Sequence, residues 1–266
     1  MIDLHLHILP GVDDGPATLD DAVALAQAAA AAGTRTVVAT SHVSDRYPNR
    51  AAGLAEARAR LQEELAARDV ALEVLPGAEI AIPQIADLAE DELRALALGG
   101  ADALLVEAPL SPAVSDVEPV LRGLLARGHR VVLAHPERSP LFLTQRSLLT
   151  MLVAEGVLTS ITASSITGRF GRTVARFARE LLDHGLVHDI ASDAHDLAGR
   201  RPEVLPVLAE AEALLPGLGE QVSWLTGEAP RAILAGERLP PPPPPLPPRE
   251  PERRGLLARL RSARRR

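Results

Sequence analysis

The chain contains no cysteine, and this absence excludes disulfides, thiolate zinc sites and any cysteine nucleophile. Aromatic residues make up only 2% of the 266 residues, so the core must be built from Ala, Leu, Val and Ile. No run of about 18 apolar residues occurs, and the N-terminus lacks the pattern of a signal peptide. These absences predict a soluble, cytoplasmic protein of one large domain or two small ones.

Lysine is also absent, so all 28 basic residues are arginines and a single arginine is a weak functional signal. Residues 249–266 hold eight arginines and two glutamates, a local charge of +6 that leaves −13 on the rest of a chain whose net charge is −7. An acidic body with a basic tail does not indicate a nucleic-acid enzyme, and no nucleic-acid partner is predicted.

The N-terminal stretch MIDLHLHILPGVDDG begins with alternating apolar and polar residues, which predicts a strand. His5 and His7 lie two residues apart, so their imidazoles project from the same face and can share one metal ion. After a break at Pro10, Asp13 and Asp14 add oxygen ligands. Taken alone, this stretch fits equally well two histidines on a half-buried strand, one of them solvated.

The rest of the chain alternates regularly between strands and helices, with a spacing of about thirty residues. Such alternation predicts parallel strands joined by right-handed crossovers, in a barrel or a doubly wound sheet. No GxGxxG or GxxxxGK[ST] motif supports a nucleotide site. Besides the N-terminal strand, the predicted strands are 34–40, 70–75, 103–106, 129–134, 157–162 and 186–191, seven in all.

Histidines and acidic residues recur at the carboxyl ends of these strands, which favours a barrel because a doubly wound sheet concentrates its site at one switch point. Mixed imidazole and carboxylate ligands suit Mn²⁺, Zn²⁺ or Fe²⁺, and they are too many for one ion, so a cluster of two or three metals is predicted. The candidate ligands are His5, His7, Asp14, His42, Glu79, Glu107, His135, Asp193 and His195.

Two arginines follow candidate ligands closely. Arg138 lies three residues after His135, and Arg200 lies five residues after His195. Guanidinium groups beside a metal cluster can bind phosphate oxygens in bidentate fashion, while closely spaced divalent ions generate hydroxide from water. Hydrolysis of a phosphate ester is therefore the predicted chemistry.

The motifs that carry this pattern are HLHILPGVDDG, VATSH, PGAE, VE, AHPER, SITGRFG and ASDAH. In this order, from residue 1 to about 235, they resemble the PHP (polymerase and histidinol phosphatase) superfamily. Within it, the chain resembles the bacterial manganese-dependent protein-tyrosine phosphatases of capsule and exopolysaccharide gene clusters. The resemblance implies an α/β fold with a distorted seven-stranded (β/α) barrel, a TIM-like PHP barrel, and a trinuclear site.

The resemblance also implies roles for individual residues. Arg138 and Arg200 match phosphate-contacting arginines of the family. Two departures occur: Val43 stands where the family usually has a second histidine, and Ala78 replaces a glutamine beside a ligand. The implied ligand sets are His5, His7, Glu79 and Asp193 for the first ion, Glu79, Glu107 and His135 for the second, and Asp14, His42 and His195 for the third.

The expected function is hydrolysis of phosphotyrosine by a metal-bridging hydroxide, and the missing cysteine agrees with it. By resemblance, the substrate and partner is a bacterial tyrosine kinase that controls polysaccharide synthesis, and the preferred cofactor is Mn²⁺, two or three ions per chain. Two alternatives stay open. One is a phosphatase for a small molecule such as histidinol phosphate or a nucleotide, and the other is a non-catalytic metal-binding scaffold.

The C-terminal composition predicts three regions. Residues 1–238 form the metallophosphatase domain, residues 239–252 a proline-rich linker and residues 253–266 a basic tail with the composition of a short amphipathic helix. The run PPPPPPLPP at 240–248 favours an extended polyproline II spacer. The tail is expected to be disordered and solubilising, and the alternative is weak attachment to an anionic membrane or an acidic partner.

Overall fold

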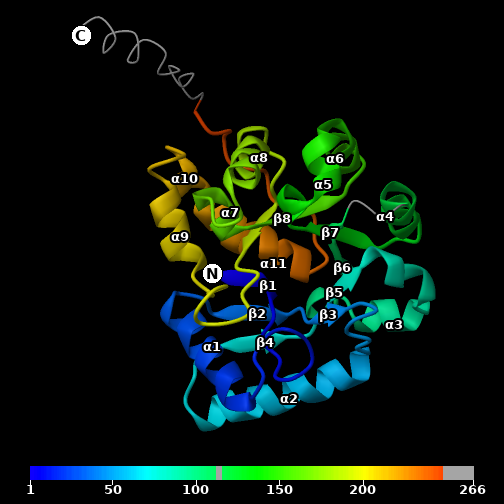
Figure 1. Cartoon of the computed structure of the whole chain (residues 1–266), viewed down its shortest axis with the longest axis vertical. Helices are drawn as coiled ribbons and strands as arrows, with labels where there is room; N and C mark the ends of the chain where they lie inside the picture. Colours follow the sequence, from blue (N-terminus) through cyan, green and yellow to red (C-terminus); the bar gives the residue numbers. More distant parts are fainter. Residues whose placement is uncertain (112–115, 248–266) are drawn as a thin grey trace, which may run out of the picture.

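The computed structural model describes residues 1–111 and 116–247, and the predicted tail at 253–266 lies outside them (Figure 1). Every strand pairing in this part of the chain is parallel, as the alternation predicts. The strands are β1 (Ile2–Leu6), β2 (Thr36–Ala39), β3 (His42–Val43), β4 (Glu73–Leu75), β5 (Glu79–Ala81), β6 (Ala103–Glu107), β7 (Arg130–Ala134), β8 (Leu158–Thr162) and β9 (Asp189–Ala191).

Helices connect these strands and pack around the sheets (Figure 1). The N-terminal cap of the first helix is Thr18, whose side chain accepts a hydrogen bond from the Asp21 amide in a reciprocal capping box. The α-helices are α1 (Leu19–Ala31), α2 (Ala51–Ala67), α3 (Glu90–Ala95), α4 (Val117–Ala126), α5 (Pro140–Thr144), α6 (Arg146–Ala154), α7 (Ala163–Thr167), α8 (Arg172–Asp183), α9 (Val204–Ala211), α10 (Leu218–Ser223) and α11 (Ala229–Leu234).

Shorter helical turns complete the connections. The segment after β7 is two helices, α5 and α6, because the backbone at Gln145 is not helical. Strand β8 leads directly into the short helix α7, whose C-terminal cap is Gly168 in the left-handed conformation. The 3₁₀ turns are η1 (Ile82–Asp87), η2 (Leu98–Gly100) and η3 (Pro136–Arg138), and η4 (Trp224–Glu228) is a π turn.

The strands form two sheets, of order β1-β2-β4 and β3-β5-β6-β7-β8-β9. The predicted α/β class with parallel strands is confirmed, but the described residues do not form the single continuous seven-stranded sheet expected of a barrel. The physical reason lies in two interrupted strands. Pairing ends at Ala39 and resumes at His42, and it ends at Leu75 and resumes at Glu79.

Both interruptions have a local cause. The Leu6 amide donates to the hydroxyl oxygen of Thr40 at 2.9 Å, and the Thr40 amide donates to the Leu6 carbonyl at 3.1 Å, so Thr40 is bonded to β1 on both counts where the pairing of β2 with β4 has already ended at Val38. Pro76 has no amide hydrogen to donate to a ladder. A Cβ added at Gly77 would lie 2.5 Å from Cγ1 of Val38, so the chain turns where only glycine fits.

The two sheets meet again at β1 and β9. Leu6 and Ala194 form an isolated parallel bridge, and the His7 amide donates to the Ala194 carbonyl at 3.0 Å. The Asp193 amide donates to the His5 carbonyl at 2.8 Å. These bonds bring the carboxyl end of β9 beside that of β1, which joins the first and last strands of the chain.

The core is aliphatic, as the composition predicts. The large cluster packs the helices against the sheets. A smaller cluster joins Leu4, Val38, Leu105 and Val132 of four different strands to Ile233 of α11. In the described residues, no helix is long and apolar enough to cross a membrane.

Candidate metal centre

The two N-terminal histidines point to the same place, although β1 ends at Leu6. Nε2 of His5 lies 3.1 Å from Nε2 of His7, and both side chains are buried. Nδ1 of His7 donates to Oδ2 of Asp13 at 2.9 Å, which leaves its Nε2 as the lone-pair nitrogen. Two imidazoles held in this way can ligate a common ion.

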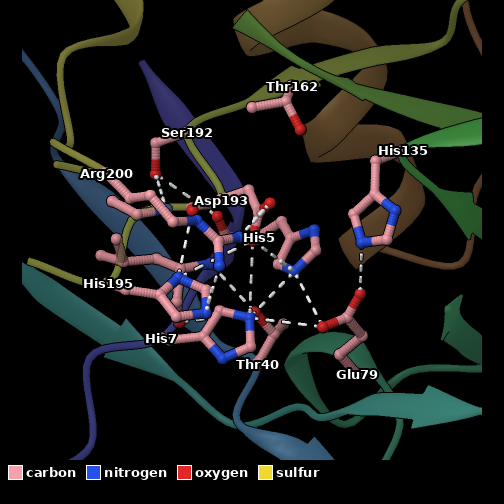
Figure 2. Close-up of polar contacts among 12 residues, drawn as sticks. His5, His7, Thr40, Glu79, His135, Thr162, Ser192, Asp193, His195 and Arg200 are labelled. Carbon is pink, nitrogen blue, oxygen red and sulfur yellow. Dashed lines mark hydrogen bonds and ion pairs between the residues drawn. The ribbon is translucent and has the colours of Figure 1, made fainter. Parts of the chain in front are cut away.

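Glu79, the first residue of β5, lies between the pair His5 and His7 on one side and His135 on the other (Figure 2). Its Oε2 is 3.3 Å from Nε2 of both His5 and His7, and 3.0 Å from Nδ1 of His42. Its Oε1 is 2.8 Å from Nε2 of His135. Burial opposes ionisation of this carboxyl, but the neighbouring histidines, His5 foremost, hold its pKa well below the ordinary value. A carboxylate with histidines at both oxygens is arranged to bridge two ions.

Asp193 follows β9 and forms a group of candidate ligands with His5 and His7. Its Oδ1 lies 3.4 Å from Nε2 of His5 and 3.6 Å from Nε2 of His7, while its Oδ2 accepts hydrogen bonds from Arg138 and Arg200. Burial acts against the charged form, yet His5 and the arginines keep the pKa of Asp193 far below its usual range.

Two ligand candidates have left-handed backbones, which are costly for residues with a side chain. His135 has φ of 36° and Asp193 has φ of 50°. Backbone bonds hold both: the His135 amide donates to the Ser160 carbonyl at 2.7 Å, and the Asp193 amide to the His5 carbonyl. Such strain turns the two side chains toward Glu79 and His5, respectively.

The outer part of the cluster involves His42, Asp14 and His195. Oδ1 of Asp14 lies 3.3 Å from Nε2 of His195 and 3.5 Å from Nε2 of His42, and the rings of His195 and His7 stack at 3.8 Å. The Asp14 side chain is 41% exposed, which marks the open side of the site. Arg200 donates to Nε2 of His195 at 2.9 Å.

Glu107, at the end of β6, groups with His42 and Glu79. Burial, reinforced by the charge of Glu79, raises its pKa to about 7. Within the described residues, all nine candidate ligands predicted from the sequence fall into groups whose ligand atoms lie within 4.8 Å of one another. The groups are His5/His7/Asp193, His5/Glu79/His135, His42/Glu79/Glu107 and His7/Asp14/His42/His195.

The cluster fits a set of divalent cations by its chemistry. It offers imidazole nitrogens and carboxylate oxygens but no sulfur, a donor set suited to Mn²⁺, Zn²⁺ and Fe²⁺. Two buried acceptors, Oε2 of Glu79 and Oδ1 of Asp193, accept no hydrogen bond of good geometry from any described residue, although imidazole nitrogens lie close to both. Buried carboxylate oxygens without donors are costly unless a cation compensates them.

Asp13 belongs to the site in a role that the sequence does not reveal. It is absent from the ligand groups, and its buried Oδ2 instead accepts from Nδ1 of His7 and from the His42 amide at 3.0 Å. Its Oδ1 accepts from the Gly15 amide. Burial opposes ionisation of the Asp13 carboxyl, but these hydrogen bonds outweigh it and lower the pKa of Asp13 to about 2. Asp13 therefore orients one ligand and holds the backbone of another.

Two further residues near the site, Glu137 and Tyr47, cannot be identified from the sequence. Glu137, inside the AHPER motif, is fully buried, and its Oε1 accepts from the Thr162 amide at 3.0 Å and from the Ser165 hydroxyl at 2.7 Å. Tyr47 is the single tyrosine of the chain, and its ring stacks on His42 with centroids 5.7 Å apart. The spacing of motifs carries no signal for either contact, because both depend on loop conformation.

The predicted arginines both lie at the cluster. Arg138 and Arg200 converge on Oδ2 of Asp193, and the Arg138 guanidinium lies 4.4 Å from the centre of the Phe170 ring. Next to them is a pocket of about 130 Å³, which is lined by Phe170, Asp193, Arg200 and neighbouring residues of α7 and the loop after β9. The pocket therefore presents the arginine side chains of Arg200 and its neighbours beside the candidate ligands.

The remaining three histidines lie outside these ligand groups, in agreement with a structural interpretation. Nε2 of His129 is 2.9 Å from Oε1 of Glu90, and Nδ1 of His188 accepts from the Thr159 amide at 3.1 Å. His184 bonds the Glu180 carbonyl within α8.

This fold and site define a parallel α/β protein with a candidate metal centre at the strand ends, and comparison with known proteins gives the family. Residues 1–215 match the family model described as capsular polysaccharide synthesis, CpsB/CapC. The chain is 38% identical to the tyrosine-protein phosphatase YwqE of Bacillus subtilis (strain 168) over 203 residues, which cover 75% of this chain and 79% of YwqE. The chain belongs to the CpsB/CapC family.

Further relatives agree. The putative tyrosine-protein phosphatase CapC of Staphylococcus aureus is 30% identical over 242 residues, covering 90% of this chain and 93% of CapC. A crystal structure from work on YwqE of Bacillus subtilis and CpsB of Streptococcus pneumoniae, described as unique metal-dependent tyrosine phosphatases, superposes with a TM-score of 0.79 at 33% identity. It covers 94% of this chain and 100% of the matched chain. These matches confirm the resemblance to the tyrosine-phosphatase branch of the PHP superfamily.

Proposed function

We propose that this chain is a metal-dependent phosphomonoesterase that hydrolyses phosphotyrosine in proteins. The observation that carries the proposal is the convergence of nine imidazole and carboxylate side chains from strand ends on one cluster, with two arginines at its edge. Relatives named as tyrosine-protein phosphatases, and the metal dependence described for a solved relative, support the choice of reaction.

We further propose that the two sheets act as one distorted seven-stranded barrel. In this interpretation β2 with β3, and β4 with β5, are each one strand with a break. The bridge between Leu6 and Ala194 then closes the ring between β1 and β9. The breaks lie where His42 and Glu79 enter the site, so the distortion serves to bring these two side chains inward.

The residues that would hold the ions are the nine ligand candidates, divided as the family resemblance implies, with Mn²⁺ preferred and two or three ions per chain. Zn²⁺ and Fe²⁺ are the alternatives. When bound, the ions supply a hydroxide from water and polarise the phosphoryl group. Glu79 is the residue with ligands on both sides, so it is the proposed shared carboxylate.

Side chains of this chain would bind the phosphate and the aromatic ring of the substrate. Arg138 and Arg200 now share one oxygen of Asp193, and the partly exposed Arg200 can turn to the equatorial oxygens of a phosphate. Phe170 holds the Arg138 guanidinium by its ring face. Tyr47, stacked on His42, offers an aromatic surface beside the cluster. A phenolate leaves readily because its conjugate acid has a pKa of about 10.

The proposed substrate is the phosphorylated tyrosine kinase that regulates capsule or exopolysaccharide synthesis, in the cytoplasm. The names of relatives and the capsular family description support it. A proline-rich segment at 239–252 that separates the rest of the chain from the basic tail, and a weak contact of that tail with an anionic membrane or acidic partner, are part of the same proposal. A small-molecule phosphatase and a non-catalytic scaffold are the competing functions.

The experiment compares hydrolysis of a phosphotyrosyl peptide with that of histidinol phosphate, for wild type and His135→Ala, with metal content measured on the same preparations. We expect preference for the peptide, more than one bound metal per chain, and loss of activity in His135→Ala. Preference for histidinol phosphate would favour the small-molecule alternative. Less than about one metal per chain, with no activity after Mn²⁺ addition, would favour the scaffold.

A further inference from the structure

The proline run does not leave the domain at residue 239. Residues 240–247 pass over the π turn η4 and helix α10, and two side chains there donate to proline carbonyls. Nε1 of Trp224 donates to the Pro240 carbonyl at 3.3 Å, and Nε2 of Gln221 donates to the Pro244 carbonyl at 2.9 Å. Proline has no amide hydrogen, so these carbonyls are the only backbone groups that a protein can recognise by hydrogen bonding.

Burial along the segment repeats every three residues. Pro240 and Pro243 are partly covered and Leu246 is 8% exposed, whereas the residues between them are exposed. Polyproline II has three residues per turn, so these side chains form one face of such a helix. Only trans peptide bonds occur in the described chain, as polyproline II requires.

The contact surface is shaped for this segment. Leu246 packs into the large hydrophobic cluster of the domain. At Gly217, where φ is +90°, an added Cβ would lie 2.9 Å from Cδ of Pro247, so a larger residue would collide with the segment. An aromatic indole, an amide donor and a close backbone approach are the elements with which polyproline helices are recognised.

This surface lies far from the metal centre. Arg130, the first residue of β7, donates to the Glu237 carbonyl at 2.6 Å, so the segment starts at the amino ends of the strands. His188, just before β9, lines a pocket of about 610 Å³ together with Trp224 and residues 238–242. The ligand candidates occupy the opposite, carboxyl ends.

We propose that α10 and η4 form a binding site for polyproline II segments, and that residues 240–247 of this chain are its resident ligand. The site takes a proline-rich segment with the spacing Pro240, Pro243 and Leu246. The arginine-rich sequence that starts at Arg249 therefore follows an anchored segment rather than a free spacer. This proposal is independent of the phosphatase activity.

The chain has one tryptophan and one tyrosine, so fluorescence excited at wavelengths that tyrosine does not absorb reports on Trp224 alone. In the full-length chain, Leu246→Asp places a charge on the inward face, and Pro245→Asp places the same charge on the exposed face. We expect a red shift of the emission maximum for Leu246→Asp and the wild-type maximum for Pro245→Asp. Equal spectra for the two variants would overturn the proposal.

A peptide of residues 240–247 then tests recognition. Added at millimolar concentration, it should reverse the red shift of Leu246→Asp, and the same peptide carrying Leu246→Asp should not. Adding Gln221→Ala to the variant should weaken peptide binding about 2- to 10-fold, the loss of one hydrogen bond. A shift that the peptide does not reverse would mean ordinary packing and refute a binding site.

Folding of the variants is checked by far-UV circular dichroism and by hydrolysis of a phosphotyrosyl peptide, both expected at wild-type level. If Leu246→Asp fails the folding check, Pro243→Gly replaces it, because glycine loosens the polyproline helix without placing a charge in the core. The spectrum of Pro243→Gly is then compared with that of Pro245→Gly, with the same expected contrast.

Discussion

Replacing Asp13 with asparagine changes one oxygen to an amide and tests how the site holds its histidines. Oδ2 of Asp13 accepts from Nδ1 of His7 at 2.9 Å, so the proton sits on Nδ1 and the lone pair of Nε2 faces the cluster. If the amide nitrogen of the asparagine takes the position of Oδ2, it donates a hydrogen bond to His7 instead of accepting one. His7 must then carry its proton on Nε2, where it blocks metal binding.

Asparagine can place its single oxygen either toward His7 and the His42 amide or toward the Gly15 amide, and not toward both sides. The His42 amide at 3.0 Å or the Gly15 amide at 2.9 Å then loses its acceptor. Changes of this kind in groups that orient metal-bound histidines cost about 10- to 100-fold in metal affinity or activity. We expect Asp13→Asn in that range, which corresponds to about 1.4 to 2.8 kcal/mol.

The assay is titration of metal-depleted protein with Mn²⁺, followed by phosphotyrosyl-peptide hydrolysis. The matched control is Glu212→Gln, since Glu212 also accepts from two backbone amides, those of Gly217 and Gly219, and lies outside the ligand groups of the described residues. Wild-type Mn²⁺ affinity in Asp13→Asn would refute the reasoning, as would an equal loss in the control.

Three other predictions concern Tyr47, Glu137 and His188. Tyr47→Ala should lower kcat/KM for aryl phosphates more than for alkyl phosphates, and Tyr47→Phe should restore it, because the ring stacked on His42 is retained; equal losses on both substrate types would contradict this role. Glu137→Ala should destabilise the domain by about 1 to 3 kcal/mol in urea unfolding, since the buried Thr162 amide loses its acceptor; an unchanged midpoint would tell against it. Burial lowers the pKa of His188 to about 4, so the unfolded state binds the extra proton first and stability is lost as pH falls from about 6.5 to 4, by up to about 3 kcal/mol; His188→Gln should flatten that part of the pH profile.

The parallel strands and the ligand candidates could be predicted because both follow from local patterns. Apolar runs separated by helical segments place strand ends, and a histidine or carboxylate at a strand end of a parallel fold faces the same side as its counterparts. Glu79 and His135 were therefore assigned to one site although they are 56 residues apart, and they lie 2.8 Å from each other.

Other features depend on tertiary contacts that leave no pattern in the sequence. The break at Gly77 arises from the approach of Val38, a residue 39 positions earlier. The left-handed backbones of His135 and Asp193 are imposed by bonds to neighbouring strands. In the sequence, Asp13 has the same pattern as the candidate metal ligand Asp14. Only the buried contact of Asp13 with His7 shows that it orients a ligand rather than binding an ion itself.

The most direct test of the central claim is a crystal structure of the protein with Mn²⁺, with anomalous diffraction recorded at the manganese absorption edge. We expect two or three anomalous peaks among the nine side chains, with Glu79 ligating two ions and Asp13 ligating none. A single peak elsewhere, or no peak within coordinating distance of Glu79, would contradict it.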